Sequence, residues 1–134
     1  MLALQLLYQV DLTGDSLVDS MAALWGVDDI PMDIRAFAEG LARGVRENMG
    51  EIDRLIRSSS EHWRIDRMPL VDRNILRIAV YELLHCPDIP ERATINEAIE
   101  LGKRFSTEDS GAFINGVLDQ VRATVFPVEA RESS

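Results

Sequence analysis

Apolar residues recur every three or four positions along most of this chain, and polar residues fill the positions between them. No stretch alternates apolar and polar residues for long enough to indicate a β-strand. The pattern therefore predicts an all-α protein, a bundle of about seven helices. Turn signals separate the expected helices: Thr13-Gly14-Asp15, Gly26, Ser58-Ser59-Ser60, the Pro-bounded loop over residues 86–90 and the polar turn over residues 106–110.

The expected helices follow from these boundaries. We expect a first helix over residues 1–12, a second over 16–25, and a long amphipathic helix after Pro31, which continues unbroken to residue 57 or divides at Gly50. Three more are expected over residues 70–85, 94–105 and 110–126. The residues from Thr94 to Glu97 have the capping-box pattern, and a start nearer Pro90 stays open.

The spacing also predicts which side of each helix is buried. Gly40 and Gly44, four residues apart, favour the close approach of a neighbouring helix. The stripe expected to face the core of the long helix is Ile34, Phe37, Ala38, Leu41, Val45, Met49, Ile52, Leu55 and Ile56. The inner face expected for the helix before Ser106 is Ile95, Ala98, Ile99, Gly102 and Phe105.

The size and composition fit one domain. A chain of 134 residues with 46% hydrophobic residues can build its own core. We expect a single domain over residues 1–134, with an N-terminal helical half to about residue 58, a C-terminal half over 59–127 and a frayed tail over 128–134. The uncharged start is too short to span a bilayer, no basic leader precedes a cleavage site, and Cys86 is the only cysteine. A cytoplasmic protein is expected, with no place in a membrane.

The charge is unevenly distributed. The formal net charge is −9, which argues against broad, sequence-independent binding to nucleic acid. Residues 1–34 hold six aspartates and no Lys or Arg, whereas residues 35–77 hold nine arginines and seven acids. Any phosphate-facing surface must therefore use residues from Arg35 onward.

The sequence offers no motif for catalysis. It has no Gly-rich phosphate loop, no cysteine pair at zinc spacing and no nucleophile elbow. His85 and Cys86 are adjacent, but successive residues on a helix point in different directions, so they do not form a catalytic dyad. We expect no enzymatic activity, no metal site and no cofactor.

Three strings in the second half carry a resemblance to a known family: RNILRIAVYELL over residues 73–84, TINEAIELGKRF over 94–105 and EDSGAFINGVLD over 108–119. The string ALQLLY over residues 3–8 adds to it. These strings resemble the NusB family of bacterial transcription antitermination factors. The resemblance covers nearly the whole chain. It implies a NusB-like helical bundle of two packed halves that acts as a non-catalytic adaptor for boxA-type single-stranded RNA.

The resemblance also implies RNA contacts. Asp109 and Phe113 match residues that lie against RNA in the family, and Tyr8 matches a tyrosine of the first helix. Each has another interpretation: Asp109 or Ser110 as a helix N-cap, and Phe113 and Tyr8 as core rings. Lys103 and Arg104, one turn earlier, are candidate phosphate contacts, although two cations also suit the end of a helix.

A protein partner is implied as well. By resemblance, the helix over residues 70–85 docks the small-subunit ribosomal protein that acts as NusE, within an RNA polymerase antitermination complex. Asp72 falls where the family carries an acid. Asp72, Arg73, Arg77 and Glu82 form a charged strip that is otherwise interpreted as a solvated face. The acidic net charge suits a basic partner. A monomer and a homodimer both stay open.

An alternative is the NusB-like RNA-recognition domain of a ribosomal RNA cytosine methyltransferase, which needs a further cofactor-binding domain. In NusB proteins an Arg-rich arm precedes the ALQ string and contacts boxA RNA, whereas Met1-Leu2 stands there in this sequence. Fewer phosphate contacts mean weaker binding and a smaller salt dependence. We therefore expect this chain to bind boxA-like RNA poorly on its own, and an added basic arm to strengthen the binding.

Overall fold

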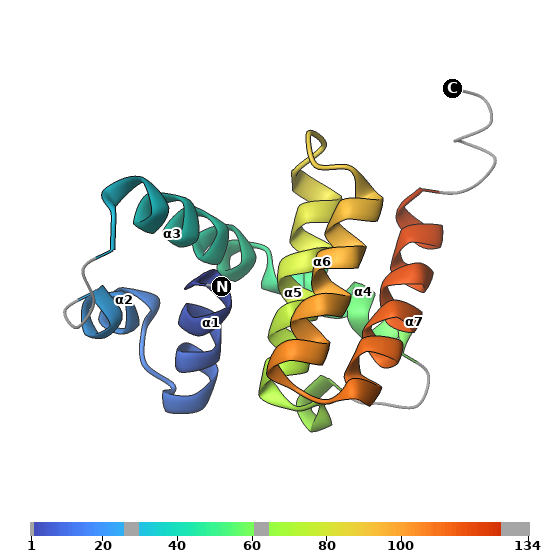
Figure 1. The fold of residues 1–134 in the computed structure, drawn as a ribbon, viewed down its shortest axis with the longest axis horizontal. Helices are drawn as coiled ribbons and strands as arrows, with labels where there is room; N and C mark the ends of the chain where they lie inside the picture. The colour runs from blue at the N-terminus through green and yellow to red at the C-terminus, as the bar shows by residue number, and fades with distance from the viewer. Residues whose placement is uncertain (1, 26–29, 61–64, 127–134) are drawn as a thin grey trace.

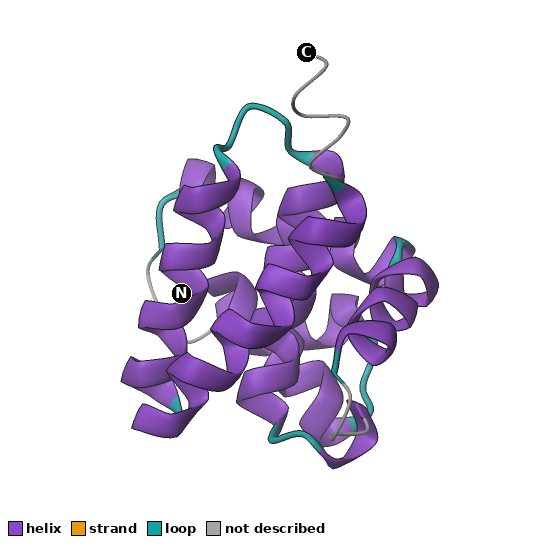
Figure 2. Cartoon of the chain, turned by 90° about the vertical axis from the view of Figure 1, so that its right-hand side faces the viewer, coloured by secondary structure: helices purple, strands orange, loops and turns teal. Residues whose placement is uncertain are grey.

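The computed structural model describes residues 2–25, 30–60 and 65–126. Within these residues all regular structure is helical (Figures 1 and 2), so the prediction of an all-α protein is confirmed. The expected tail over residues 128–134 lies outside the described residues. The elements are α1 Leu2–Thr13, α2 Leu17–Trp25, α3 Met32–Glu47, α4 Met49–Ser59, the 3-10 helix η1 Ile65–Arg67, α5 Leu70–His85, α6 Glu91–Phe105 and α7 Glu108–Val125.

Helix α5 is the central element. It packs against α1, α3, α4, α6 and α7, and every residue from Asn74 to Val80 is buried. In Figure 1, α1, α2 and α3 lie on one side of α5, and α6 and α7 lie on the other. Helices α5, α6 and α7 run alternately up and down, so the start of α5, the end of α6 and the start of α7 meet at the same end of the bundle. None of the described helices is long and apolar enough to cross a membrane.

The long helix expected after Pro31 is divided into α3 and α4 at Asn48, two residues before Gly50. Asn48 leaves the helical conformation, with φ −113° and ψ 17°, and its backbone N–H bonds to the carbonyls of Gly44 and Val45. Its side-chain amide also donates to the Gly44 carbonyl, at 2.8 Å. The break therefore depends on an asparagine that satisfies the carbonyls of the ending helix.

Part of the predicted buried stripe is wrong. Ile34 and Phe37 are 47% and 69% exposed, and the buried stripe of α3 begins only at Ala38. Figure 1 shows the cause: the first turns of α3 lie at the end of that helix farthest from α5. Phe105, expected on an inner face, is also 47% exposed, because it lies in the last turn of α6.

The predicted close approach of a neighbouring helix is confirmed at Gly44 and wrong at Gly40. A Cβ on Gly44 would overlap the Tyr81 ring of α5, whereas a Cβ on Gly40 would meet nothing within 4 Å. Helix α6 begins directly after Pro90 and not at Thr94. The Thr94 hydroxyl instead donates to Glu82 Oε2 at 3.2 Å, which joins α6 to α5.

Candidate nucleic-acid interface

The corner between α6 and α7 is set by two residues that cap α7. The Thr107 hydroxyl accepts from the Ser110 backbone N–H at 3.1 Å, and the Thr107 backbone N–H reaches the Ser110 hydroxyl at 3.4 Å. This is a capping box with Thr107 as the N-cap. The interpretation of Asp109 or Ser110 as the N-cap is therefore wrong. Asp109 lies in the first turn of α7, where its negative charge favours the positive end of the helix.

Ser110 also joins this corner to the start of α5. Its Oγ donates to Asp72 Oδ2 at 2.9 Å and lies 3.0 Å from each of the Ser106 and Thr107 hydroxyls. Ser110 and Asp72 are both buried, at 5% and 4% exposure. A hydrogen bond in such surroundings is well protected from water. The first turn of α7 therefore has a fixed position on α5.

A hollow of about 310 Å³ opens between these elements. It brings together three of the residues expected to contact a ligand: Asp72 from α5, and Asp109 and Phe113 from α7. Asp109 is exposed at its rim and Phe113 is half-buried. Within the described part of the chain, Asp72 Oδ1 is buried without a hydrogen-bond partner. The other residues that line this hollow are Pro69, Ser106, Thr107 and Ser110.

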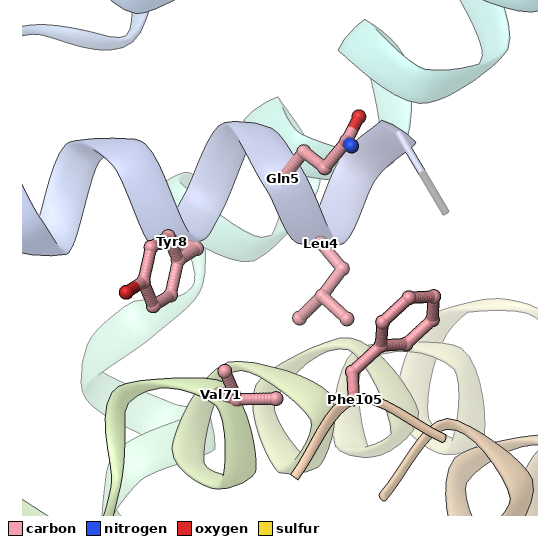
Figure 3. A pocket seen from close by; sticks show the side chains of 5 residues that line it. All are labelled: Leu4, Gln5, Tyr8, Val71 and Phe105. Carbon is pink, nitrogen blue, oxygen red and sulfur yellow. The ribbon is translucent and has the colours of Figure 1, made fainter.

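A second hollow, of about 190 Å³, contains Tyr8. Figure 3 shows Leu4 and Tyr8 projecting from α1 toward Val71 of α5 and Phe105 of α6. The two hollows are neighbours, because Val71 precedes Asp72 and Phe105 precedes Ser106 in the chain. The exposed Phe105 lines the second hollow, and the next residue, Ser106, lines the first. Gln5 is the remaining lining residue of the second hollow.

The predicted cations lie at the same end of α6. Lys103 and Arg104 are exposed, and Arg104 lies over the Phe105 ring at 5.7 Å. The Lys103 stem passes over Gly111, where a Cβ would lie 3.0 Å from Lys103 Cγ. Its amine is 3.9 Å from the Glu100 carboxylate, a weak exposed pair. Both cations are therefore accessible to a phosphate beside the hollows.

Arg73 and Arg77 are directed elsewhere. Arg77 donates to both carboxylate oxygens of Asp53 on α4, at 2.9 and 3.1 Å, and to Asp11 Oδ2 on α1 at 3.0 Å. The same Asp11 oxygen accepts from Arg73 Nε at 2.9 Å and from Asn74 Nδ2 at 2.8 Å. We call Asp11, Asp53, Arg73, Asn74 and Arg77 the ionic clasp. The interpretation of this strip as a solvated face is wrong, because Arg77 is 7% exposed.

The clasp changes the acidity of Asp11. Burial alone would raise the pKa of this carboxyl group. The hydrogen bonds from Arg73 and Asn74, with the positive charges of Arg77 and Arg73, outweigh burial and lower the pKa below the ordinary value of 3.8. Asp11 is therefore held as a carboxylate that joins α1 to α5.

Two further features concern metal binding and the reactivity of the Cys86 thiol. Among the described residues, no group of three or more His, Cys, Asp or Glu side chains is placed to hold a metal ion. Burial, together with the negative charges of Glu82 and Asp88, raises the pKa of the Cys86 thiol. A thiol with a raised pKa is a poor nucleophile at neutral pH.

Sequence reasoning missed three residues that build this region. The sequence indicates Ser110 only as a cap, Phe105 only as a core residue, and Asp11 only as one of six acidic residues near the start. The Thr-x-x-Ser spacing from residue 107 to 110 is a recognisable capping signal. By contrast, no local sequence pattern indicates that Asp11 contacts Arg77, which is 66 residues away in the chain.

Comparisons with known proteins identify the family to which this chain belongs. The NusB family model matches residues 1–123. The chain is 45% identical over 131 residues to a transcription antitermination protein NusB from Anaeromyxobacter dehalogenans, covering 97% of this chain and 92% of the relative. The fold is similar to T. maritima NusB, with a TM-score of 0.83, 39% identity, and 98% and 92% of the two chains covered.

A further similar structure holds antitermination factors NusB and NusE in complex with dsRNA. The TM-score is 0.77 at 27% identity, and 92% of each chain is covered. The family model and the relatives extend through α1 and through the corner between α6 and α7. The resemblance inferred from the sequence is therefore confirmed, and this chain belongs to the NusB family.

Proposed function

We propose that this protein is a transcription antitermination factor that binds boxA-type single-stranded RNA together with the small-subunit ribosomal protein acting as NusE. It works as an adaptor within an RNA polymerase antitermination complex. The observation that carries the proposal is the α6–α7 corner, where two neighbouring hollows and two exposed cations are presented by a NusB-family fold. Because transcription takes place in the bacterial cytoplasm, the protein works there.

The RNA path follows the residues at this corner. Lys103 and Arg104 contact phosphates, because both cations are exposed beside the hollows. Phe113 and Tyr8 offer ring faces on which unpaired bases stack, since each ring lines a hollow open to solvent. Asp109, at the rim, adds an acceptor for a base or sugar hydroxyl. A related structure contains dsRNA, so the strandedness of the ligand needs a direct test.

NusE docks beside this corner. The resemblance assigns Asp72, Arg73 and Arg77 to that surface. Because the ionic clasp holds Arg77 inside the molecule, we propose that Arg77 serves docking only by fixing α5, and that the exposed residues around the start of α5 make the contacts. The net charge of −9 favours a basic partner and speeds its association.

No enzymatic step forms part of the proposal. The polar side chains of the corner are hydroxyls and carboxylates joined by hydrogen bonds, and the Cys86 thiol has a raised pKa. The corner therefore has a place for a nucleic-acid strand and no activated nucleophile beside it.

A pull-down with purified small-subunit ribosomal proteins tests the adaptor role. We expect the chain to retain one basic protein, and the complex to bind boxA RNA more tightly than either protein alone. The RNA is offered both as a single strand and annealed to its complement, and the single strand is expected to bind better. Failure to retain any ribosomal protein, with no gain in RNA affinity, would refute the proposal.

A further inference from the structure

The hollow beside Phe113 is lined by Asp72, whose side chain holds a buried acceptor without a hydrogen bond among the described residues. Asp72 Oδ2 accepts the Ser110 hydroxyl at 2.9 Å, whereas Asp72 Oδ1 has no partner within the described residues. The side chain is 4% exposed and lines the hollow. Leaving a buried acceptor without a hydrogen bond is unfavourable, because the acceptor has lost its contact with water and gained none in return. A ligand that donates to Oδ1 removes this penalty.

From this arrangement we propose that the hollow binds one unstacked nucleobase that carries an exocyclic amino group, whose N–H donates to Asp72 Oδ1. The inference rests on the proposed RNA-binding function and assigns Asp72 to the RNA, not to the protein partner. Carboxylates accept from the amino group of cytosine, and single-stranded bases are recognised by stacking together with hydrogen bonds to their edges. The hollow offers both, because Phe113 supplies a ring and Asp72 an acceptor in the same cavity.

Selectivity follows from the kind of atom that meets Oδ1. Cytosine and adenine present an amino group at the position where uracil and hypoxanthine present a carbonyl oxygen. A carbonyl oxygen facing Oδ1 gives no hydrogen bond and repels the acceptor. The hollow therefore selects amino-bearing bases over uracil.

Ser110 is the positioning residue. The carboxylate can turn about its last bond unless one oxygen is held, and the Ser110 hydroxyl holds Oδ2. Ser110 is itself fixed by the capping box with Thr107 and by the neighbouring Ser106 hydroxyl. The acceptor is thus oriented before the base arrives, which lowers the entropy lost on binding.

The entrance is formed by movable side chains. Asp72 Oδ1 exposes less than 1 Å² in this ligand-free structure, so a base reaches it only after side chains at the rim move aside. Asp109 is exposed and lies at the rim. Its displacement leaves the capping box and the buried hydrogen bond between Ser110 and Asp72 in place.

The decisive experiment changes the RNA and leaves the protein intact. Eight-nucleotide strands of cytidine, adenosine and uridine, and a cytidine strand in which pyrimidin-2-one replaces each cytosine, are titrated by fluorescence anisotropy at low salt with the basic partner present. We expect the cytidine strand to bind about five- to tenfold more tightly than the uridine strand. Removal of the amino group is expected to abolish this preference, and equal affinities for all strands would overturn the inference.

Variants then connect the preference to named residues. Asp72→Ala and the nearly isosteric Asp72→Asn are expected to reduce the ratio of cytidine to uridine affinity to within about twofold. Ser110→Ala should reduce it partly. Thr124→Ala is the matched control, because Thr124 is an exposed residue of α7 whose hydroxyl donates to the Gln120 carbonyl, away from the hollow. It should keep the full ratio.

The outcomes separate the inference from the proposed function. If no strand and no boxA RNA binds the intact complex, the proposed function fails. If RNA binds but the base ratio is unchanged in the Asp72 variants, the proposed function stands and the inference is overturned. If the same variants lose the basic partner and keep the ratio, Asp72 belongs to the protein interface, which also overturns it.

Discussion

Helix α5 carries two buried polar centres that differ in one respect. Arg77, in the ionic clasp, has its donors occupied by Asp53 and Asp11 of the same chain. Asp72, at the start of the helix, has one oxygen bonded to Ser110, and its other oxygen has no hydrogen-bond partner in the part of the chain that the structure describes. Polar groups whose hydrogen bonds are all internal stabilise a fold, whereas a buried polar group with an unused bond calls for an explanation, and at Asp72 we propose a ligand. The two centres therefore have different roles although they are five residues apart.

The largest effect is expected at Arg77, where a substitution tests whether the ionic clasp stabilises the fold. Replacement by Met leaves Asp11 and Asp53 without their shared cation, and we expect the free energy of unfolding to fall by about 3 kcal/mol. Urea unfolding followed by circular dichroism measures this. Arg57→Met is the control, because Arg57 is exposed on α4 and its replacement should change stability by less than about 1 kcal/mol. RNA affinity of the folded Arg77→Met protein should stay within about twofold of the wild type. A large loss of affinity would show that the ionic clasp also takes part in RNA binding.

The second-largest effect is expected at Phe113, where a substitution tests RNA binding in the hollow that Asp72 also lines. Phe113→Leu keeps an apolar side chain but removes the ring face, and RNA affinity should fall by about 1 to 3 kcal/mol, roughly 5- to 150-fold. Phe37→Leu is the control, since Phe37 is 69% exposed on α3 and away from the corner. Equal losses for the two variants would argue against a stacking site beside Asp72. Titration of labelled boxA RNA gives both affinities.

The exposed cations of α6 should have a smaller effect that depends on salt. Lys103→Gln and Arg104→Gln each remove a phosphate contact, so the dependence of log affinity on log salt should flatten by about 0.7 per residue. Affinity at physiological salt should fall about threefold for each. Arg43→Gln, an exposed residue of α3, is the control and should leave the slope unchanged. A slope that does not respond to Lys103 or Arg104 would place the RNA elsewhere.

The smallest effect concerns acid. Because the pKa of Asp11 is lowered in the folded protein, the clasp stabilises the fold fully above the ordinary value of 3.8. This contribution is lost as pH falls below 3.8 toward the lower pKa of the folded state. Asp11→Asn should lose stability at pH 7 and show a weaker further loss in this acid range than the wild type. Thermal unfolding from pH 5 to pH 2.5 measures both, and parallel curves would exclude Asp11 as the titrating group.

The sequence predicted much of this fold because local signals were strong. Pro31 and Pro69 set the starts of α3 and α5, and Met32 and Leu70 follow them directly. At Thr94 a capping-box pattern competed with Pro90, and the proline determined the start of α6. Periodicity gave the side of α3 that faces inward, but it could not show that Phe37 extends beyond the neighbouring helices.

The candidate site was predictable only in part. Asp72, Asp109 and Phe113 came from a family resemblance, and the structure brings them together in one hollow. The hydrogen bond between Ser110 and Asp72 spans 38 residues, and the one between Arg77 and Asp11 spans 66. Contacts at such separations depend on how helices pack, which no local pattern records. Sequence reasoning therefore named the residues of the hollow without showing which oxygen stays unused.

The ionic clasp has a consequence for synthesis on the ribosome. Asp11 emerges early, but its partners Arg73 and Arg77 follow more than sixty residues later. Until α5 has been translated, the apolar residues Leu6 and Leu7 of α1 lack the helix that covers them in the finished protein. Nascent chains with exposed apolar surface are prone to association. Helices α1 and α3 therefore complete their packing only after α5 has been translated. A chaperone would be most useful during this interval.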